Sequence, residues 1–586
     1  MKRIRPANVR VRLYGVAMVL ALSSSALIVR AVDLQVVRKD FYQEQGDQRF
    51  LRDIPIPVSR GTIFDRNGEP LAVSTPVDSI WANPVDVLGA ADRLPELAKA
   101  LDLDEEDLKQ KLVQRSDKEF VYLKRHLNPD DAKAILKLDI PGVASEREFR
   151  RYYPNGEVMA HVLGFTNIDD RGQEGLELAF DDWLAGKPGM KRVIRDLHGQ
   201  VVENVELLRE AQPGRDLTLS IDRRIQYLAY RELKAGLAEH HATSGSMVIL
   251  DVPTGEVLAM VNAPSFNPNA RGGDPSLRRN RAVTDVVEPG STIKAFTISA
   301  ALESGKWKAH TPVDTTPGTF TLADGRVIRD VHNKGLLDVT GVITHSSNVG
   351  AAKIGLTLTR DHLYDVDHRF GFGEVTGSGF PGESPGLLPI PKSWGPVEQA
   401  TISYGYGLNV TPLQLANAYT AIANDGRLRS PTYVKGAQNP DTAVIDPEIA
   451  ASIRRMLETV VTPEGSGLKA AITNYRVAGK TGTSRAASGG GYDNRHISLF
   501  VGMVPASKPR LVGVVVIHDP EGVYYGGLVS APVFSKVMDG ALRLLDVPPD
   551  NVKNWYTASP QGTPTLDAKA PASEDVELSN YAEGVP

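Results

Sequence analysis

Three short stretches of the chain carry side chains that could together perform acyl transfer. The first places Ser291 and Lys294 directly after Pro289-Gly290, in an apolar run that reaches Leu302. Positions three apart share one face of a helix, so the Lys294 amine can lie beside the Ser291 hydroxyl. A serine needs a nearby base to act as a nucleophile. A buried lysine can be that base, because desolvation disfavours its charged form. This stretch predicts a nucleophile and its base on one core helix.

The second stretch pairs Ser346 with Asn348, just before the small residues 349–352, which permit close packing against another element. Each pattern is weak when taken alone. Residues 265–267 repeat Ser-x-Asn and residues 466–469 repeat Ser-x-x-Lys, as chance allows in a long chain. Structural alternatives are a helix N-cap for either serine and a solvated surface position for the lysine.

The third stretch, residues 480–483, reads Lys-Thr-Gly-Thr and continues as a strand. Strand alternation puts Lys480 on one face and Thr481 and Thr483 on the other. Gly482 would let a ligand approach the backbone. A nucleotide-binding P-loop is excluded, because that pattern needs an earlier glycine where Asn474 stands and a helix after the lysine.

Composition narrows the possible functions. The 586 residues allow several domains at a soft ~150 residues each. A net charge of -5 gives no reason to expect a nucleic-acid partner. The absence of cysteine excludes disulfides and cysteine catalysis. The 12 histidines show no metal-ligand spacing, so neither a metal nor another cofactor is expected.

The N-terminus predicts a membrane anchor. Residues 1–12 hold five basic side chains and no acid, and the 17 residues from Leu13 to Val29 carry no charge. A helix of that length spans about 25 Å, just enough for a bilayer core of ~30 Å. We expect an anchor over residues 13–32 with the basic tail in the cytoplasm and the rest exported. A cleaved signal peptide is the alternative, supported by the small residues 21–26.

Composition shifts suggest three further regions. Residues 50–210 mix acidic helical stretches, charged loops and an Asn67-Gly68 hairpin signal, without a nucleophile and base, which favours a scaffold or interaction module. Residues 211–547 combine helices with β-rich runs, including a hairpin over 246–261 and a last helix over 532–545. Residues 548–586 are rich in Pro, Asp and Glu, and we expect them to be disordered.

The three stretches occur in the order shared by penicillin-binding proteins and serine β-lactamases, which the chain resembles. The anchor and two further patterns, Arg60-Gly61 with Asp65-Arg66-Asn67-Gly68 and Gln173-x-Gly175-x-Glu177, resemble class B penicillin-binding proteins. Residues 403–416 resemble the septal, cell-division member. The resemblance implies an α+β transpeptidase domain with an antiparallel five-stranded sheet between helices, an elongated N-terminal pedestal and one transmembrane helix.

The resemblance also implies a reaction, the cross-linking of peptidoglycan stem peptides by a D,D-transpeptidase. Ser291 would attack the D-Ala–D-Ala carbonyl and Lys294 would take its proton. Ser346, helped by Lys480, would relay a proton to the leaving amine. The remaining site residues would bind substrate: Asn348, Thr481, Gly482 and Thr483.

The implied partners are stem peptides, β-lactam antibiotics, a septal multi-pass glycosyltransferase and other division proteins. The implied location is the bacterial inner membrane, with the catalytic domain in the periplasm. An elongation-type transpeptidase and a catalytically silent β-lactam-binding scaffold remain alternatives. A β-lactamase is disfavoured, because the Glu-x-x-Leu-Asn pattern that supplies a deacylating base in one class of these enzymes is absent.

Overall fold

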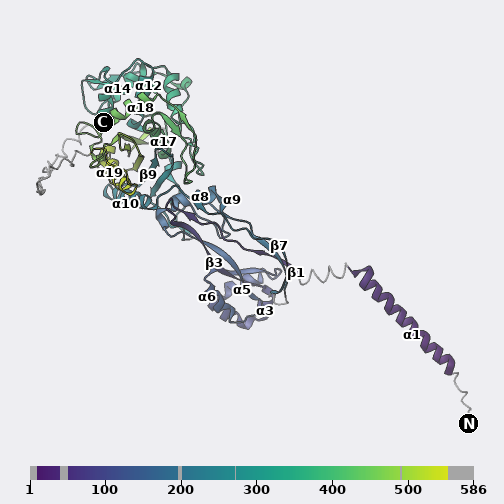
Figure 1. Cartoon of the computed structure of the whole chain (residues 1–586). Coiled ribbons are helices and arrows are strands. Elements are labelled where there is room, and N and C mark those ends of the chain that lie inside the picture. The colour runs from purple at the N-terminus through teal and green to yellow at the C-terminus, as the bar shows by residue number, and fades with distance from the viewer. Residues whose placement is uncertain (1–8, 40–50, 196–200, 271, 489–490, 552–586) are drawn as a thin grey trace, which may run out of the picture. The chain divides into compact units, whose positions relative to one another are not determined.

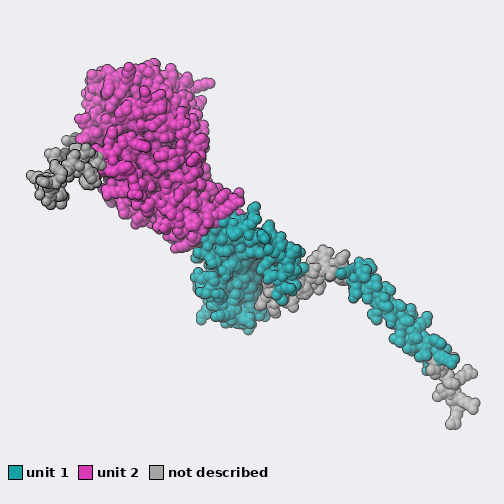
Figure 2. Space-filling model, in the orientation of Figure 1, with its two compact units in different colours: residues 1–60, 74–150, 185–214 teal, residues 61–73, 151–184, 215–586 magenta. Residues whose placement is uncertain are grey.

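The computed structural model describes residues 9–39, 51–195, 201–270, 272–488 and 491–551 (Figure 1). The predicted C-terminal tail lies almost entirely outside these residues. The chain forms two compact units, coloured separately in Figure 2. Unit 1 comprises residues 1–60, 74–150 and 185–214, and unit 2 comprises residues 61–73, 151–184 and 215–586.

The N-terminal helix α1 covers Val9–Val32. Among the residues described, one helical segment, Arg10–Val37, is long and apolar enough to cross a membrane, with a mean hydropathy of 1.9 over its best window. None of that window is buried inside the protein. Within the described part of the chain its apolar side chains are left uncovered, as expected of a segment that faces lipid.

Unit 1 is built from short strands and helices. Strands β1 (Leu51–Ile56), β6 (Gly189–Arg195) and β7 (Val201–Arg209) form a sheet in that order. The later part of β3 (Pro70–Ala82) pairs antiparallel with β4 (Val121–Leu127). The predicted helices near residues 103–137 are present as α5 (Glu105–Val113) and α6 (Pro129–Leu136). These helices pack with α3 (Pro84–Gly89) and α4 (Leu94–Leu101) around a small core of their own.

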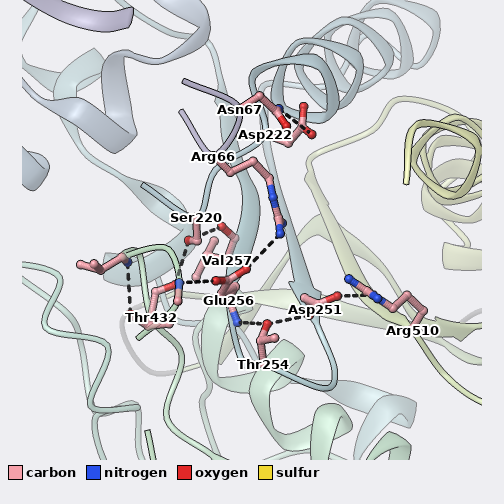
Figure 3. Close-up of polar contacts among 12 residues, drawn as sticks. Arg66, Asn67, Ser220, Asp222, Asp251, Thr254, Glu256, Val257, Thr432 and Arg510 are labelled. Carbon is pink, nitrogen blue, oxygen red and sulfur yellow. Dashed lines mark hydrogen bonds and ion pairs between the residues drawn. The ribbon is translucent and has the colours of Figure 1, made fainter. Parts of the chain in front are cut away.

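The predicted hairpin at Asn67-Gly68 opens unit 2. Strand β2 (Ile63–Phe64) pairs with the start of β3, and Gly68 has a φ of +88° at the turn. Polar contacts join this turn to neighbouring segments (Figure 3). Arg66 forms a 3.2 Å ion pair with Glu256, and the Asn67 amide donates to Asp222 at 3.1 Å. Because the Glu256 side chain is nearly fully buried, its pairing with Arg66 offsets the cost of burying a charge.

A five-stranded antiparallel sheet forms the centre of unit 2, as predicted, in the order β10-β9-β19-β18-β17. The predicted hairpin is β9 (Ser244–Asp251) with β10 (Val257–Ala263). In β9, Met247 and Ile249 join one hydrophobic cluster, and Val248 and Leu250 join another. Both faces of the sheet are therefore buried, which explains why its strands are apolar throughout. The other strands are β17 (Ala478–Ser488), β18 (Gly491–Val504) and β19 (Leu511–His518).

Helices cover both faces of this sheet. Helices α10 (Arg223–Glu239) and α19 (Gly526–Leu544) pack on one face, and α17 (Pro412–Ala423) packs on the other. Asp222 caps α10 and Thr411 forms a capping box at α17. Helix α12 (Lys294–Glu303) packs against α14 (Asn348–Leu356), α15 (Arg360–Arg369) and α18 (Pro447–Thr459).

The prediction that the last helix starts at Pro532 is wrong, because α19 begins at Gly526. Proline is common in the first turn of a helix, but Pro532 lies inside α19. The two leading glycines are required by packing. A β-carbon on Gly526 would lie 2.1 Å from the Leu499 carbonyl oxygen, and one on Gly527 would lie 2.1 Å from that of Ser466. Close packing against the sheet thus outweighs the low helix propensity of glycine.

The remaining elements of unit 2 are short. Strand β8 covers Leu217–Thr218 and pairs parallel with β2. Three two-stranded ribbons lie in the segments between the main helices: β11 (Pro312–Asp314) with β14 (Leu336–Asp338), β12 (Thr319–Thr321) with β13 (Val327–Arg329), and β15 (Arg427–Arg429) with β16 (Asp441–Ala443). The short helices are α7 (Ala160–Leu163), α8 (Gly175–Ala179), α9 (Asp181–Leu184), α11 (Arg281–Thr284), α13 (Val339–Thr344) and α16 (Pro396–Ile402).

Candidate active site

The candidate nucleophile lies on a turn tighter than the predicted helix. Residues Gly290–Ile293 form a single 3₁₀ turn, and α12 begins at Lys294. The backbone N–H of Lys294 donates to the Ser291 carbonyl, three residues back. In a 3₁₀ turn, side chains three apart are eclipsed. This geometry places the Lys294 amine 2.9 Å from the Ser291 hydroxyl.

The contacts of Lys294 suit an amine that changes its charge. Besides Ser291, its Nζ lies 2.6 Å from the Ser346 carbonyl oxygen and 2.7 Å from the Asn348 amide oxygen. A neutral amine has two N–H donors for those two oxygens and a lone pair that accepts from the Ser291 hydroxyl. A protonated amine has three donors for all three atoms. The same geometry therefore serves Lys294 before and after it takes a proton from Ser291.

Burial sets the proton affinity of the two lysines. Lys294 and Lys480 are both fully buried. Desolvation is the main cause that lowers the pKa of Lys294 well below its usual value; nearby Lys480 lowers it further, and Asp330 opposes the shift. Desolvation lowers the pKa of Lys480 to about 7. Both shifts favour a neutral amine at the site, which is the state that a general base requires.

Ser346 lies between the two lysines. It follows α13 and adopts a left-handed backbone with φ +59°, which is uncommon for residues other than glycine. Its hydroxyl receives a hydrogen bond from Lys480 at 2.8 Å and lies 3.3 Å from the Lys294 amine. A hydroxyl in contact with two amines can accept a proton from one and pass its own to another group.

A carboxylate that the sequence did not single out holds the Ser346 segment. Asp330 accepts from the Ser347 hydroxyl at 2.5 Å and from the backbone N–H groups of Asn348 and Val349 at 2.6 and 2.9 Å. These bonds satisfy donors at the start of α14 and place a negative charge at a helix N-terminus. No local pattern marks Asp330, because its partners lie 17 to 19 residues further along the chain.

Strand β17 brings Lys480 to Ser346 and also supports the nucleophile turn. A β-carbon on Gly482 would lie 3.0 Å from both the Pro289 carbonyl oxygen and the Thr292 methyl group. One face of Gly482 is therefore filled by the turn that carries Ser291. The Thr483 hydroxyl accepts from the backbone of Gly526 at 3.2 Å. In the order of the sheet β17 is an edge strand, so its other side is not paired with a strand in the sheet.

The neighbourhood of Thr481 contains a second residue that the sequence did not assign. The Ser466 hydroxyl lies 2.8 Å from the Thr481 hydroxyl, although residues 466–469 resemble a chance motif in the sequence. The Lys480 amine lies 3.5 Å from the same Thr481 oxygen. The only local sign for Ser466 is a Gly-Ser-Gly turn, which does not reveal what the turn contacts.

The turn over residues 403–407 packs directly on the segment before Ser291. The N–H of Gly290 donates to the Gly405 carbonyl at 3.1 Å, and that of Gly407 donates to Glu288 at 2.8 Å. A β-carbon on Gly405 would lie 1.9 Å from the Gly290 carbonyl oxygen, so this position requires glycine. The rings of Tyr404 and Tyr406 contact each other from this turn.

The structure thus brings together six of the eight predicted site residues through direct side-chain contacts: Ser291, Lys294, Ser346, Asn348, Lys480 and Thr481. Gly482 and Thr483 follow on the same strand. Within the described part of the chain, no group of three or more His, Cys, Asp or Glu side chains could hold a metal ion.

Comparison with known proteins identifies the family. The model of the penicillin-binding protein transpeptidase domain matches residues 245–539, and that of the penicillin-binding protein dimerisation domain matches residues 55–219. The probable peptidoglycan D,D-transpeptidase PbpC of Pseudomonas aeruginosa is 45% identical over 537 residues, covering 91% of this chain and 95% of that protein. The peptidoglycan D,D-transpeptidase FtsI of Escherichia coli K12 is 44% identical over 538 residues, covering 90% and 91%.

Solved structures agree with this assignment. A peptidoglycan synthetase from Bifidobacterium adolescentis has a TM-score of 0.68 at 27% identity and covers 88% of this chain and 98% of its own. The TP domain of Burkholderia pseudomallei penicillin-binding protein 3 has a TM-score of 0.53 at 44% identity and covers 57% and 97%. The predicted transpeptidase fold is confirmed, and the chain belongs to the class B penicillin-binding proteins.

Proposed function

We propose that Ser291 is the acylated nucleophile of a peptidoglycan D,D-transpeptidase, the activity for which the two relatives above are named. The observation that carries this proposal is the 2.9 Å contact between the Ser291 hydroxyl and the buried Lys294 amine. Because burial lowers the pKa of this lysine, its neutral amine can act as the general base for the serine. The substrate is the D-Ala–D-Ala end of a peptidoglycan stem peptide.

The proton moves along the side chains that the site brings together. Lys294 takes the Ser291 proton as the oxygen attacks the donor carbonyl. Ser346, in contact with Lys294 and Lys480, passes its proton to the departing D-alanine amine and takes one from the protonated Lys294, which returns to its neutral form. An acceptor amine from a second stem peptide then attacks the acyl-enzyme, and the proton steps run in reverse.

Strand β17 is the proposed binding edge for the donor peptide. Extended peptides add to exposed sheet edges through main-chain hydrogen bonds, and β17 is at an edge of its sheet. Thr481 and Thr483 would bind the terminal carboxylate, and Asn348 would hold the peptide amide. Gly482 would let the donor peptide approach the backbone of the strand. The backbone N–H groups of Ser291 and Thr483 would form the oxyanion hole, in which one donor contributes roughly 10²–10³ in rate.

The cellular setting is also part of the proposal. Helix α1 would anchor the protein in the bacterial inner membrane, with its basic end in the cytoplasm and the catalytic domain in the periplasm. Residues 50–210 would act as a pedestal for partners and residues 211–547 as the transpeptidase domain. The septum is the expected place of action, with a multi-pass glycosyltransferase as partner. Support comes from the similarity to FtsI of Escherichia coli.

The intact mass of the detergent-solubilised full chain after exposure to benzylpenicillin tests the proposal. We expect a long-lived adduct on the peptide that contains Ser291, and no adduct on Ser291→Ala. An adduct on another serine would overturn the assignment of the nucleophile. Consumption of the drug without a lasting adduct would indicate a β-lactamase, and an untouched drug would indicate a silent scaffold.

A further inference from the structure

A buried tyrosine contacts the backbone of the nucleophile turn. Tyr419 lies on α17 and is fully buried. Its hydroxyl donates a 2.7 Å hydrogen bond to the carbonyl of Thr292, the residue directly after Ser291. Its ring packs edge-on against Phe296 of α12, with 5.3 Å between ring centres. Tyr419 therefore contacts both the turn that carries Ser291 and the helix that carries Lys294.

The position of this carbonyl explains why one hydrogen bond matters. Thr292 lies inside the 3₁₀ turn, just before the turn becomes α-helix at Lys294. In an α-helix the N–H of Lys294 would donate to residue 290, whereas here it donates to Ser291. Only the 3₁₀ geometry eclipses Ser291 and Lys294. An α-helical turn would keep the two residues on one face but offset them by about 60° around the helix axis, so the lysine amine would be less well aligned with the hydroxyl.

The turn is also held from its other side. The Thr292 hydroxyl donates to the Pro289 carbonyl at 2.7 Å, and Gly290 has a φ of +51°. A β-carbon on Gly290 would lie 3.0 Å from the Thr483 carbonyl oxygen of β17. The Tyr419 hydroxyl reaches this turn from a separate helix, through a side-chain hydrogen bond. Burial raises the pKa of Tyr419 well above its usual value, so its hydroxyl stays protonated and remains a donor.

We propose that Tyr419 is a positioning residue for the acylation step: its hydrogen bond to the Thr292 carbonyl keeps the turn in the 3₁₀ form that aligns the Ser291 hydroxyl with the Lys294 amine. The inference rests on the proposed function of Ser291. Tyr419 does not touch the substrate. Its removal leaves both reacting groups in place and changes their alignment, so it affects the rate of acylation rather than the binding that precedes it.

The chain offers a matched control for this proposal. Tyr433 is also buried in the core of unit 2, and its hydroxyl contacts the Met260 sulfur at 3.4 Å. Replacing Tyr433 by Phe removes one buried tyrosine hydroxyl, as Tyr419→Phe does, but leaves the turn that carries Ser291 unchanged. The two variants therefore have comparable effects on stability, but only Tyr419→Phe disturbs the site.

The test measures acylation of the detergent-solubilised full chain by a fluorescent penicillin in stopped flow, which separates the dissociation constant of the first complex from the acylation rate constant. For Tyr419→Phe we expect the rate constant to fall roughly 10-fold, because misplacement of reacting groups by about 1 Å can cost 10²-fold. The dissociation constant stays within about twofold. Tyr433→Phe keeps the parental values of both. Thermal unfolding and a repeat at 10 °C exclude loss of folded protein as the cause.

A rate constant for Tyr419→Phe within twofold of the parent would overturn the inference, as would an equal loss in Tyr433→Phe or a change confined to the dissociation constant. These outcomes leave the proposed function intact, because the parent still acylates. If the parent itself forms no adduct, it is the proposed function that fails.

Discussion

A buried acid beside α12 is expected to make the stability of this protein depend on pH. Asp367 lies on α15, which packs against α12, and its side chain is fully buried. Neither of its carboxyl oxygens has a hydrogen-bond partner among the residues described. Burial raises the pKa of Asp367 from 3.8 to about 8, because the charged form is poorly solvated there. We predict that Asp367→Asn removes this dependence.

The sign and size follow from the difference in proton binding. A folded-state pKa above the unfolded value gives a contribution to stability that is full below pH 3.8 and is lost as the pH rises to about 8. Between about pH 5 and pH 7.5 the unfolded chain is ionised at Asp367 and the folded chain is not. At about 1.4 kcal/mol per pH unit, the free energy of unfolding falls by about 3 kcal/mol over this range through this one group.

Urea unfolding of the detergent-solubilised full chain, followed by tryptophan fluorescence at about pH 5 and pH 7.5, checks this prediction. From about pH 5 to about pH 7.5, the difference in free energy of unfolding between Asp367→Asn and the parent should shift by about 3 kcal/mol in favour of the variant. The reason is that the unsatisfied amide of the variant costs the same at both pH values. Asp365→Asn is the matched control on the same helix, because the Asp365 side chain is 63% exposed and pairs with Arg369. It should change stability by less than about 1 kcal/mol. If Asp367→Asn differs from the parent equally at both pH values, the buried carboxyl is not protonated and the reasoning is refuted.

Three further predictions concern packing and the site. Glu177→Gln should lower the free energy of unfolding by about 3–5 kcal/mol in urea titrations. The substitution removes the carboxylate charge that pairs with the fully buried Arg151 guanidinium at 2.6 Å. An unchanged unfolding midpoint would contradict this prediction. Ser466→Ala should slow penicillin acylation several-fold, because it removes the hydrogen bond that holds the Thr481 hydroxyl and that contributes about 1 kcal/mol. Ser466→Thr keeps a hydroxyl at this position and should restore the rate. Gly482→Ala should slow acylation roughly 10-fold by displacing the nucleophile turn, and a parental rate in stopped flow would show that the turn absorbs the added methyl group.

Sequence reasoning predicted the elements whose signals are local. The hairpin at Asn67-Gly68 and the hairpin over residues 246–261 depend on neighbouring residues, and the structure has both of them. The five-stranded sheet was expected from the family resemblance, because the β-rich runs alone do not set the number or the order of the strands. The first two motif residues are three apart, so any helical turn places them on one face, but their eclipsed 3₁₀ alignment was not predicted.

Features that depend on distant segments could not be predicted in this way. Asp330 and Ser466 reach the site from loops whose own sequences do not reveal what they pack against. The 3₁₀ form of the nucleophile turn has a contact from Tyr419, more than a hundred residues away. The start of α19 at Gly526 is set by the sheet below it, so a prediction from helix propensity alone placed it too late.

Transfer of a donor peptide to an acceptor amine tests the central claim most directly. The detergent-solubilised full chain would be incubated with a stem peptide ending in D-Ala–D-Ala and an amine acceptor, and D-alanine release and the cross-linked product would be followed by mass spectrometry. The account predicts product from the parent and none from Ser291→Ala or Lys294→Ala. Product formed by Ser291→Ala at the parental rate, or a parent that binds penicillin covalently but makes no product, would contradict it.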